Sequence, residues 1–165
     1  MIRPLMALAV ALWTLNAPAA EPVIEPFVAA TMNALKTRYA GRPFVVAFWS
    51  VTCEPCRDEM RDWKTLQRQQ RGVPLILVGT DGPEDRAAAL AFLRRYSPRA
   101  ERQYLFTDRY TERLRYAVDP QWRGELPRTY FFDAQHRAEA SSGRLDPAWV
   151  DAWLRRQKTA PAARQ

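Results

Sequence analysis

The chain contains two cysteines, Cys53 and Cys56, in the motif Cys53-Glu54-Pro55-Cys56. A crosslink between them would close a very short loop and remove little entropy from the unfolded chain, so structural stabilisation explains the pair poorly. Two thiols this close can instead interconvert between a dithiol and a disulfide. The motif therefore predicts a redox-active pair that needs no bound cofactor.

The residues around the motif predict a strand that leads directly into a helix. Residues 44–49 (FVVAFW) are continuously apolar and rich in strand formers, whereas Met60 and Trp63 begin a helical repeat. Unpaired N–H groups at a helix N-terminus favour a thiolate, the reactive form of cysteine. We therefore expect Cys53 to attack a target disulfide and Cys56, one turn further on and less exposed, to resolve the mixed disulfide.

Metal binding by the same cysteines is the alternative interpretation. A structural zinc site normally takes four Cys or His ligands, and the chain offers two cysteines and His136. Copper(I) accepts two thiolates and one imidazole, so a copper(I) metallochaperone stays open as an alternative function. A third alternative is a binding module in which the pair is vestigial.

The first twenty of the 165 residues differ from the rest. Arg3 is their only charge, residues 5–15 are almost all apolar, and small residues follow at 17–20. This pattern predicts a signal peptide cleaved near Ala19-Ala20, because the apolar run is shorter than the roughly 20 residues of a membrane span. We expect a periplasmic or otherwise exported protein; an uncleaved anchor is the alternative.

The formal net charge is +7, or +6 once the single charge of Arg3 is removed with the signal. The basic residues are spread along the chain with acidic residues among them, as in DRYTERLR at 108–115. Because no compact basic run exists, we expect a solvated surface and no nucleic-acid partner. The length suggests one domain, and we expect a monomer.

The rest of the chain alternates between helical and strand patterns. A proline-rich connector (21–26) precedes a helix with apolar positions from Phe27 onward, which Gly41 ends. Further elements are expected as a helix to Gly72, strand 73–78, helix 84–96, strand 104–106, helix 110–117, loop 119–126, strands 128–133 and 138–142, and a helix from Asp146-Pro147. This order is typical of an α/β protein with a mostly parallel sheet and helices on both faces.

Three segments resemble the thioredoxin superfamily, and within it the exported TlpA/ResA/DsbE branch of thiol-disulfide oxidoreductases. They are Phe48-Trp49 before the motif, residues 73–81 (VPLILVGTD) and residues 125–133 (ELPRTYFFD). The resemblance implies a thioredoxin-like fold, a central mixed β-sheet flanked by helices on both faces. The expected divisions are a signal peptide (1–20), a connector and helix (21–40), a thioredoxin-like domain (41–157) and a disordered tail (158–165).

The resemblance also implies site residues and partners. Pro127 should be cis and lie against the disulfide, with the backbone of Leu126 pairing to an extended segment of the partner. The implied activity is protein-disulfide reduction, with a membrane thiol carrier of the DsbD or CcdA type as reductant. The implied substrates include the haem-binding cysteines of apocytochrome c and copper-site assembly proteins.

Three departures from the family pattern stand out. Thr52 replaces a usual tryptophan, Ala47 replaces a buried aspartate that accepts protons in many thioredoxins, and the segment before residue 44 looks helical instead of forming a hairpin. Proton transfer would then fall to water or to another carboxylate, of which Glu54 is the nearest in sequence. The charge of Glu54 also disfavours a neighbouring thiolate, which predicts a reductant in place of an oxidant.

Aromatic residues outside the motif are first interpreted as structural. Trp63, Trp149 and Trp153 are expected in the core. Trp122, in a polar loop before Pro127, is expected either in the core or in the partner groove, and His136 at the surface of a hairpin.

Overall fold

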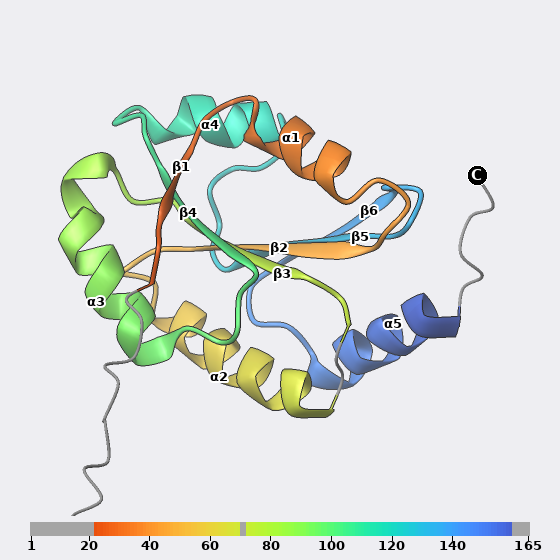
Figure 1. Cartoon of the computed structure of the whole chain (residues 1–165). Helices are drawn as coiled ribbons and strands as arrows, with labels where there is room; N and C mark the ends of the chain where they lie inside the picture. The colour runs from red at the N-terminus through yellow and green to blue at the C-terminus, as the bar shows by residue number, and fades with distance from the viewer. Residues whose placement is uncertain (1–21, 70–71, 160–165) are drawn as a thin grey trace, which may run out of the picture.

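The computed structural model describes residues 22–69 and 72–159. The expected signal peptide and most of the expected tail lie outside these residues. A six-stranded mixed sheet forms the centre, with the strand order β1-β4-β3-β2-β5-β6 (Figure 1). The strands are β1 (Glu25–Phe27), β2 (Phe44–Trp49), β3 (Leu75–Gly79), β4 (Arg102–Phe106), β5 (Arg128–Phe132) and β6 (Ala138–Ser142).

Of the six strands in the sheet, β5 runs opposite to the other five. β1, β4, β3 and β2 run parallel, whereas β5 pairs antiparallel with β2 and β6 antiparallel with β5. The carboxyl ends of the four parallel strands therefore meet at one edge, where loops in α/β sheets commonly carry ligand sites. The expected mixed sheet with an antiparallel edge is confirmed.

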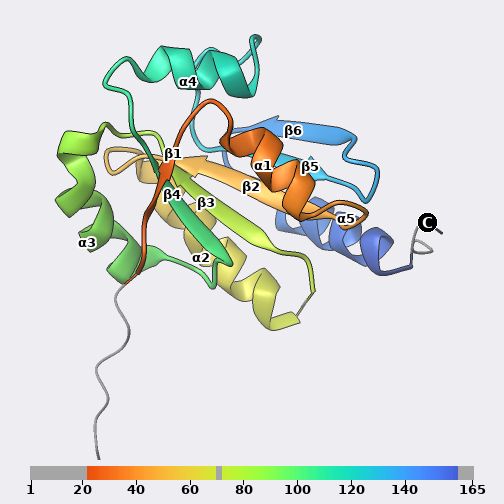
Figure 2. The same cartoon turned by 45° about the horizontal axis from the view of Figure 1, so that its top comes forward.

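Helices cover both faces of the sheet, as the sequence predicts (Figures 1 and 2). α1 and α4 lie on one face, and α2, α3 and α5 pack on the other. The helices are α1 (Thr31–Arg38), α2 (Glu54–Gln69), α3 (Arg86–Tyr96, after the short 3₁₀ turn Pro83–Asp85), α4 (Thr111–Val118) and α5 (Pro147–Thr159). Asp146 caps α5 as expected, because its Oδ1 accepts a hydrogen bond of 2.9 Å from the N–H group of Ala148.

β2 is buried on both faces and contributes side chains to two hydrophobic cores, one on each face of the sheet. Because side chains alternate along a strand, Val45, Ala47 and Trp49 join the core beneath α2, α3 and α5, while Phe48 and its alternate neighbours join the core beneath α1 and α4. Trp63 and Trp153 are buried in the first core, and Trp149 packs against it. This burial fixes the strand from which the cysteine motif departs.

Two sequence predictions are wrong at the ends of the domain. Residues 25–27 form β1, parallel to β4, so the connector contains a strand and Phe27 belongs to it and not to the helix. α5 continues through Thr159, two residues into the expected tail. In the part of the chain that the structure describes, no helix combines the length and apolar character needed to cross a bilayer.

Candidate redox-active site

Cys53 and Cys56 form a disulfide with an Sγ–Sγ distance of 2.01 Å. The chain reaches them directly from the carboxyl end of β2, and Cys56 lies in the first turn of α2. Cys56 is 1% exposed, whereas Cys53 is half-buried, so the two sulfurs differ in access as the sequence predicts. Cys53 is thus the sulfur that a macromolecular partner can reach.

The N-terminus of α2 supplies a hydrogen-bond donor to the accessible sulfur. The N–H group of Cys56 points at the Sγ of Cys53 across 3.2 Å. In the reduced protein the same donor, together with the helix dipole, would favour a thiolate at this atom. Glu54 and Pro55 are exposed beside it.

The turn between β2 and α2 is attached to the end of β3. The N–H group of Thr80 donates to the carbonyl of Trp49 across 2.8 Å. One residue later, Asp81 accepts hydrogen bonds from the hydroxyl of Ser50 (2.7 Å) and from the N–H group of Val51 (3.0 Å). The segment that leads to Cys53 is therefore held by side-chain as well as backbone contacts.

A buried carboxyl group, Glu59, lies on the same side of α2 as Cys56. The two are three residues apart, a spacing that places them on one helix face, and Glu59 is 4% exposed. Its Oε1 accepts hydrogen bonds from Thr129 (3.0 Å) and from the indole of Trp63 (3.4 Å). Burial raises the pKa of Glu59 to about 7, and these hydrogen bonds only partly offset that effect.

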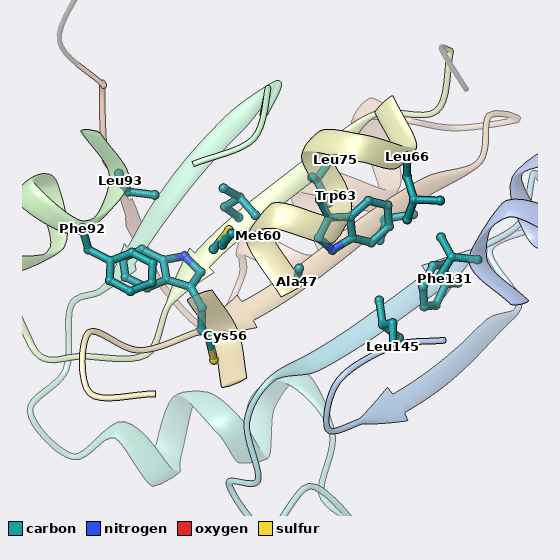
Figure 3. Close-up of a cluster of buried hydrophobic side chains, with 14 of the residues drawn as sticks. Ala47, Cys56, Met60, Trp63, Leu66, Leu75, Phe92, Leu93, Phe131 and Leu145 are labelled. Carbon is teal, nitrogen blue, oxygen red and sulfur yellow. The ribbon is translucent and has the colours of Figure 1, made fainter. Parts of the chain in front are cut away.

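Glu59 is hydrogen-bonded to the residue that pairs with Ala47 across the sheet. Thr129 stands directly opposite Ala47 in the β2–β5 pairing, and it is Thr129 that bonds the Glu59 carboxyl group. Figure 3 shows Cys56, Met60 and Trp63 extending from α2, with Ala47 on the strand facing them. A carboxyl group from the helix thus lies close to where the family pattern would place one on the strand.

Pro127 follows a cis peptide bond from Leu126, which confirms the predicted isomer. Because Phe48 pairs with Arg128, Pro127 lies beside the end of β2, where the chain turns toward Cys53. Leu126 is half-buried and packs against both cores. Direct contact of Pro127 with the disulfide, and of Leu126 with a partner, stay predictions.

An ion pair between Asp119 and Arg128 connects the loop before the cis proline to β5. Asp119 accepts hydrogen bonds from Arg128 (3.0 Å) and from the hydroxyl of Tyr130 (2.9 Å). Hydrogen bonds from the Gln121 N–H group, Tyr130 and Arg128 outweigh burial and lower the pKa of Asp119. Trp122 is buried against Phe48, so its side chain belongs to the core and not to a partner groove.

His136 lies at the opposite end of β2 from the cysteines. Its ring contacts Phe44, the first residue of β2, and its Nε2 is 3.0 Å from the carbonyl of Tyr39. A six-residue strand is about 20 Å long, so this imidazole cannot join the two sulfurs in one metal site. Among the described residues, no group of three or more His, Cys, Asp or Glu side chains could hold a metal ion.

Comparison with known proteins agrees with this architecture. No family model and no curated protein matches the sequence. A secreted disulfide oxidoreductase of Mycobacterium tuberculosis, homologous to Escherichia coli DsbE, superposes with a TM-score of 0.56 at 15% identity, covering 73% of this chain and 85% of that one. The chain has the thioredoxin fold.

Two further structures support the same conclusion. DsbF of M. tuberculosis gives a TM-score of 0.57 at 20% identity, over 73% of this chain and 84% of that one. A thioredoxin-family thiol:disulfide interchange protein of Chlorobium tepidum gives 0.58 at 17% identity, over 74% and 83%. The thioredoxin-like fold expected from the three sequence segments is therefore confirmed.

Sequence reasoning missed Glu59, Ser50 and Asp81. Glu59 stands in the charged stretch RDEMRDWK, where acidic residues read as a solvated helix surface. Its three-residue spacing from Cys56 was the available signal. Nothing in the sequence alone pairs Ser50 with Asp81, because their contact depends on β2 and β3 being neighbours.

Proposed function

We propose that this protein is a thiol-disulfide oxidoreductase that reduces disulfides of other proteins outside the cytosol. The observation that carries the proposal is the Cys53–Cys56 disulfide at the N-terminus of α2, with one sulfur accessible and the other buried. The thioredoxin fold and the secreted disulfide oxidoreductase of M. tuberculosis that shares it support the same activity. The signal-like segment at residues 1–20 supports the compartment.

The reaction proceeds by two exchanges of sulfur bonds. The Cys53 thiolate attacks one sulfur of the partner's disulfide, and the partner's other sulfur leaves as a thiolate. Cys56 then loses its proton and attacks the Cys53 sulfur, which releases the partner's second thiolate. The partner gains two electrons, and the enzyme pair ends as the disulfide seen in the structure.

Glu59 is the proposed acceptor for the Cys56 proton. Both groups are buried on one face of α2, where water has little access. A carboxyl group whose pKa is about 7 is partly ionised at neutral pH and can both take up and return a proton. Glu54, the candidate nearest in sequence, is exposed, and its part in proton transfer stays a prediction.

The charge of Glu54, next to Cys53, supports the reducing direction. Dithiol proteins that are strong oxidants stabilise their reduced, thiolate form. Here the Glu54 carboxylate stands next to Cys53 at the start of α2, and negative charge disfavours a thiolate. A reductant working outside the cytosol must be re-reduced, and we propose a membrane thiol carrier of the DsbD or CcdA type for that step.

Apocytochrome c or a copper-site assembly protein is the proposed class of substrate.

Trapping of partners tests this function. In Cys56→Ser the second exchange cannot occur, so mixed disulfides through Cys53 should accumulate in the exporting cell and disappear when dithiothreitol is added. Cys53→Ser is the matched control and should trap nothing. If Cys56→Ser forms no adducts, and the purified wild-type pair shows no reversible disulfide against glutathione, the proposal is wrong. Tight stoichiometric binding of copper(I) to the reduced protein without reductase activity would favour the metallochaperone.

A further inference from the structure

The hydroxyl of Ser50 uses its full hydrogen-bonding capacity between Asp81 and Thr52. A hydroxyl has one proton to donate and two lone pairs that accept. Ser50 donates to Asp81 Oδ1 across 2.7 Å, because a carboxylate can only accept. Its oxygen then accepts the N–H group of Thr52 (3.2 Å), and the Thr52 hydroxyl, 3.1 Å away, must be the donor of the remaining bond.

This network encloses the turn immediately before Cys53. Asp81 also accepts the N–H group of Val51, and the carbonyl of Ser50 accepts the N–H group of Cys53 across 3.2 Å. Every residue from Ser50 to Cys53 is therefore held through Ser50 or Asp81. Ser50 is buried, so its bonds compete little with water.

We infer that Ser50, anchored by Asp81 and closed by the Thr52 hydroxyl, is a positioning residue that sets the reactivity of Cys53. By fixing the turn, the network keeps the Cys53 sulfur over the N–H group of Cys56, the donor that stabilises the thiolate. Thr52 has a specific part here, because a residue without a hydroxyl could not supply the final donor. The inference rests on the proposed function, since it concerns the same attacking sulfur.

The test compares variants that remove single hydroxyl groups. Ser50→Ala removes the centre of the network, and Thr52→Val removes only one donor, at an exposed position where folding is not at risk. Thr107→Val is the matched control, because the Thr107 hydroxyl lies at the same edge of the sheet but bonds a backbone carbonyl outside the network, that of Phe27 at the end of β1 (2.9 Å). Each is placed in the Cys56→Ser background, where Cys53 is the single cysteine, and its alkylation by iodoacetamide is followed from pH 5 to pH 10.

Loss of the network should reduce the thiolate fraction. We expect Ser50→Ala to lower the alkylation rate at neutral pH by about threefold and move the pH profile to higher pH, with a smaller shift in the same direction for Thr52→Val. In chains that keep both cysteines, the equilibrium constant between the dithiol and the disulfide, measured against glutathione, should change by a similar factor. Thr107→Val should match the parent. Profiles of Ser50→Ala and Thr52→Val that coincide with the parent would overturn the inference. Absence of a reversible disulfide in the wild type would instead refute the proposed function.

Discussion

The buried carboxyl group of Glu59 makes stability depend on pH in a way that one substitution should remove. Glu59→Gln keeps an oxygen that can accept the bonds from Thr129 and Trp63, and it keeps the volume of the side chain. It replaces the second carboxyl oxygen, which is buried without a hydrogen-bond partner among the described residues, by an NH2 group and removes the ability to ionise. Because the first effect does not depend on pH, the change with pH of the stability difference between variant and wild type isolates the cost of holding a negative charge at this position.

The size of the effect follows from the pKa. An ordinary glutamate titrates near 4.5, and burial raises the pKa of Glu59 to about 7. Because the folded state holds the proton more tightly, Glu59 carries no penalty below pH 4.5; folding stability then falls as pH rises and levels off above pH 7. Two and a half pH units correspond to about 3 kcal/mol at full ionisation. Glu59→Gln should thus be more stable than wild type by about 3 kcal/mol at pH 8, relative to their difference at pH 4.5.

Urea unfolding of the oxidised proteins at pH 4.5, 6 and 8 measures this difference. Glu54→Gln, a change of the same type at an exposed position of the same helix, should stay within about 0.5 kcal/mol of wild type throughout. The stabilised Glu59→Gln should nevertheless release trapped partners more slowly near neutral pH, because Cys56 lacks its proton acceptor. A stability difference that is the same at pH 4.5 and pH 8 would refute the reasoning.

Two further predictions concern the scaffold. Trp153→Ala should lower the free energy of unfolding by about 3–5 kcal/mol because Trp153 is 1% exposed, whereas Tyr116→Ala, at 68% exposure, should change it by less than about 0.5 kcal/mol in the same urea titration. The lowered pKa of Asp119 means that its bonds to Arg128 and Tyr130 stabilise the fold above the ordinary aspartate pKa and are lost as pH falls through the folded value. Asp119→Asn should accordingly lose less stability than wild type as the pH falls below 4. An equal loss in the variant and the wild type would contradict this.

The main elements could be predicted because their signals are local. FVVAFW is short and rich in strand formers, which favours a strand buried on both faces. The helical repeat from Met60 follows soon after it, so the junction that carries the cysteines is visible in the sequence. β1 could not be predicted in this way. It has three residues, one of them a proline, and its identity as a strand comes from pairing with β4, almost eighty residues away.

The residues of the site likewise divide into those with a local signal in the sequence and those without one. The cysteines are recognisable from their spacing, and the cis isomer at Pro127 from the surrounding motif. The carboxyl group at Glu59 is not recognisable, because its burial depends on three segments at once: α2 provides the side chain, β2 provides the small Ala47, and β5 provides Thr129. Charge alone marks Glu59 as a surface residue, and only the packed structure shows that it lies in the core.

Each sulfur is thereby associated with a carboxyl group of its own, in a different environment. Asp81 is attached through Ser50 and Val51 to the turn before Cys53, from the end of a neighbouring strand. Glu59 is buried on the helix that carries Cys56. The partly exposed Asp81 holds the turn through its hydrogen bonds, whereas the buried Glu59, with a pKa of about 7, can exchange protons at neutral pH. In the proposed reaction, the attacking sulfur is positioned through Ser50 and Asp81, and the resolving sulfur gives its proton to Glu59. Because these groups lie on separate elements of the fold, variants at Ser50 and at Glu59 should affect different steps of that reaction.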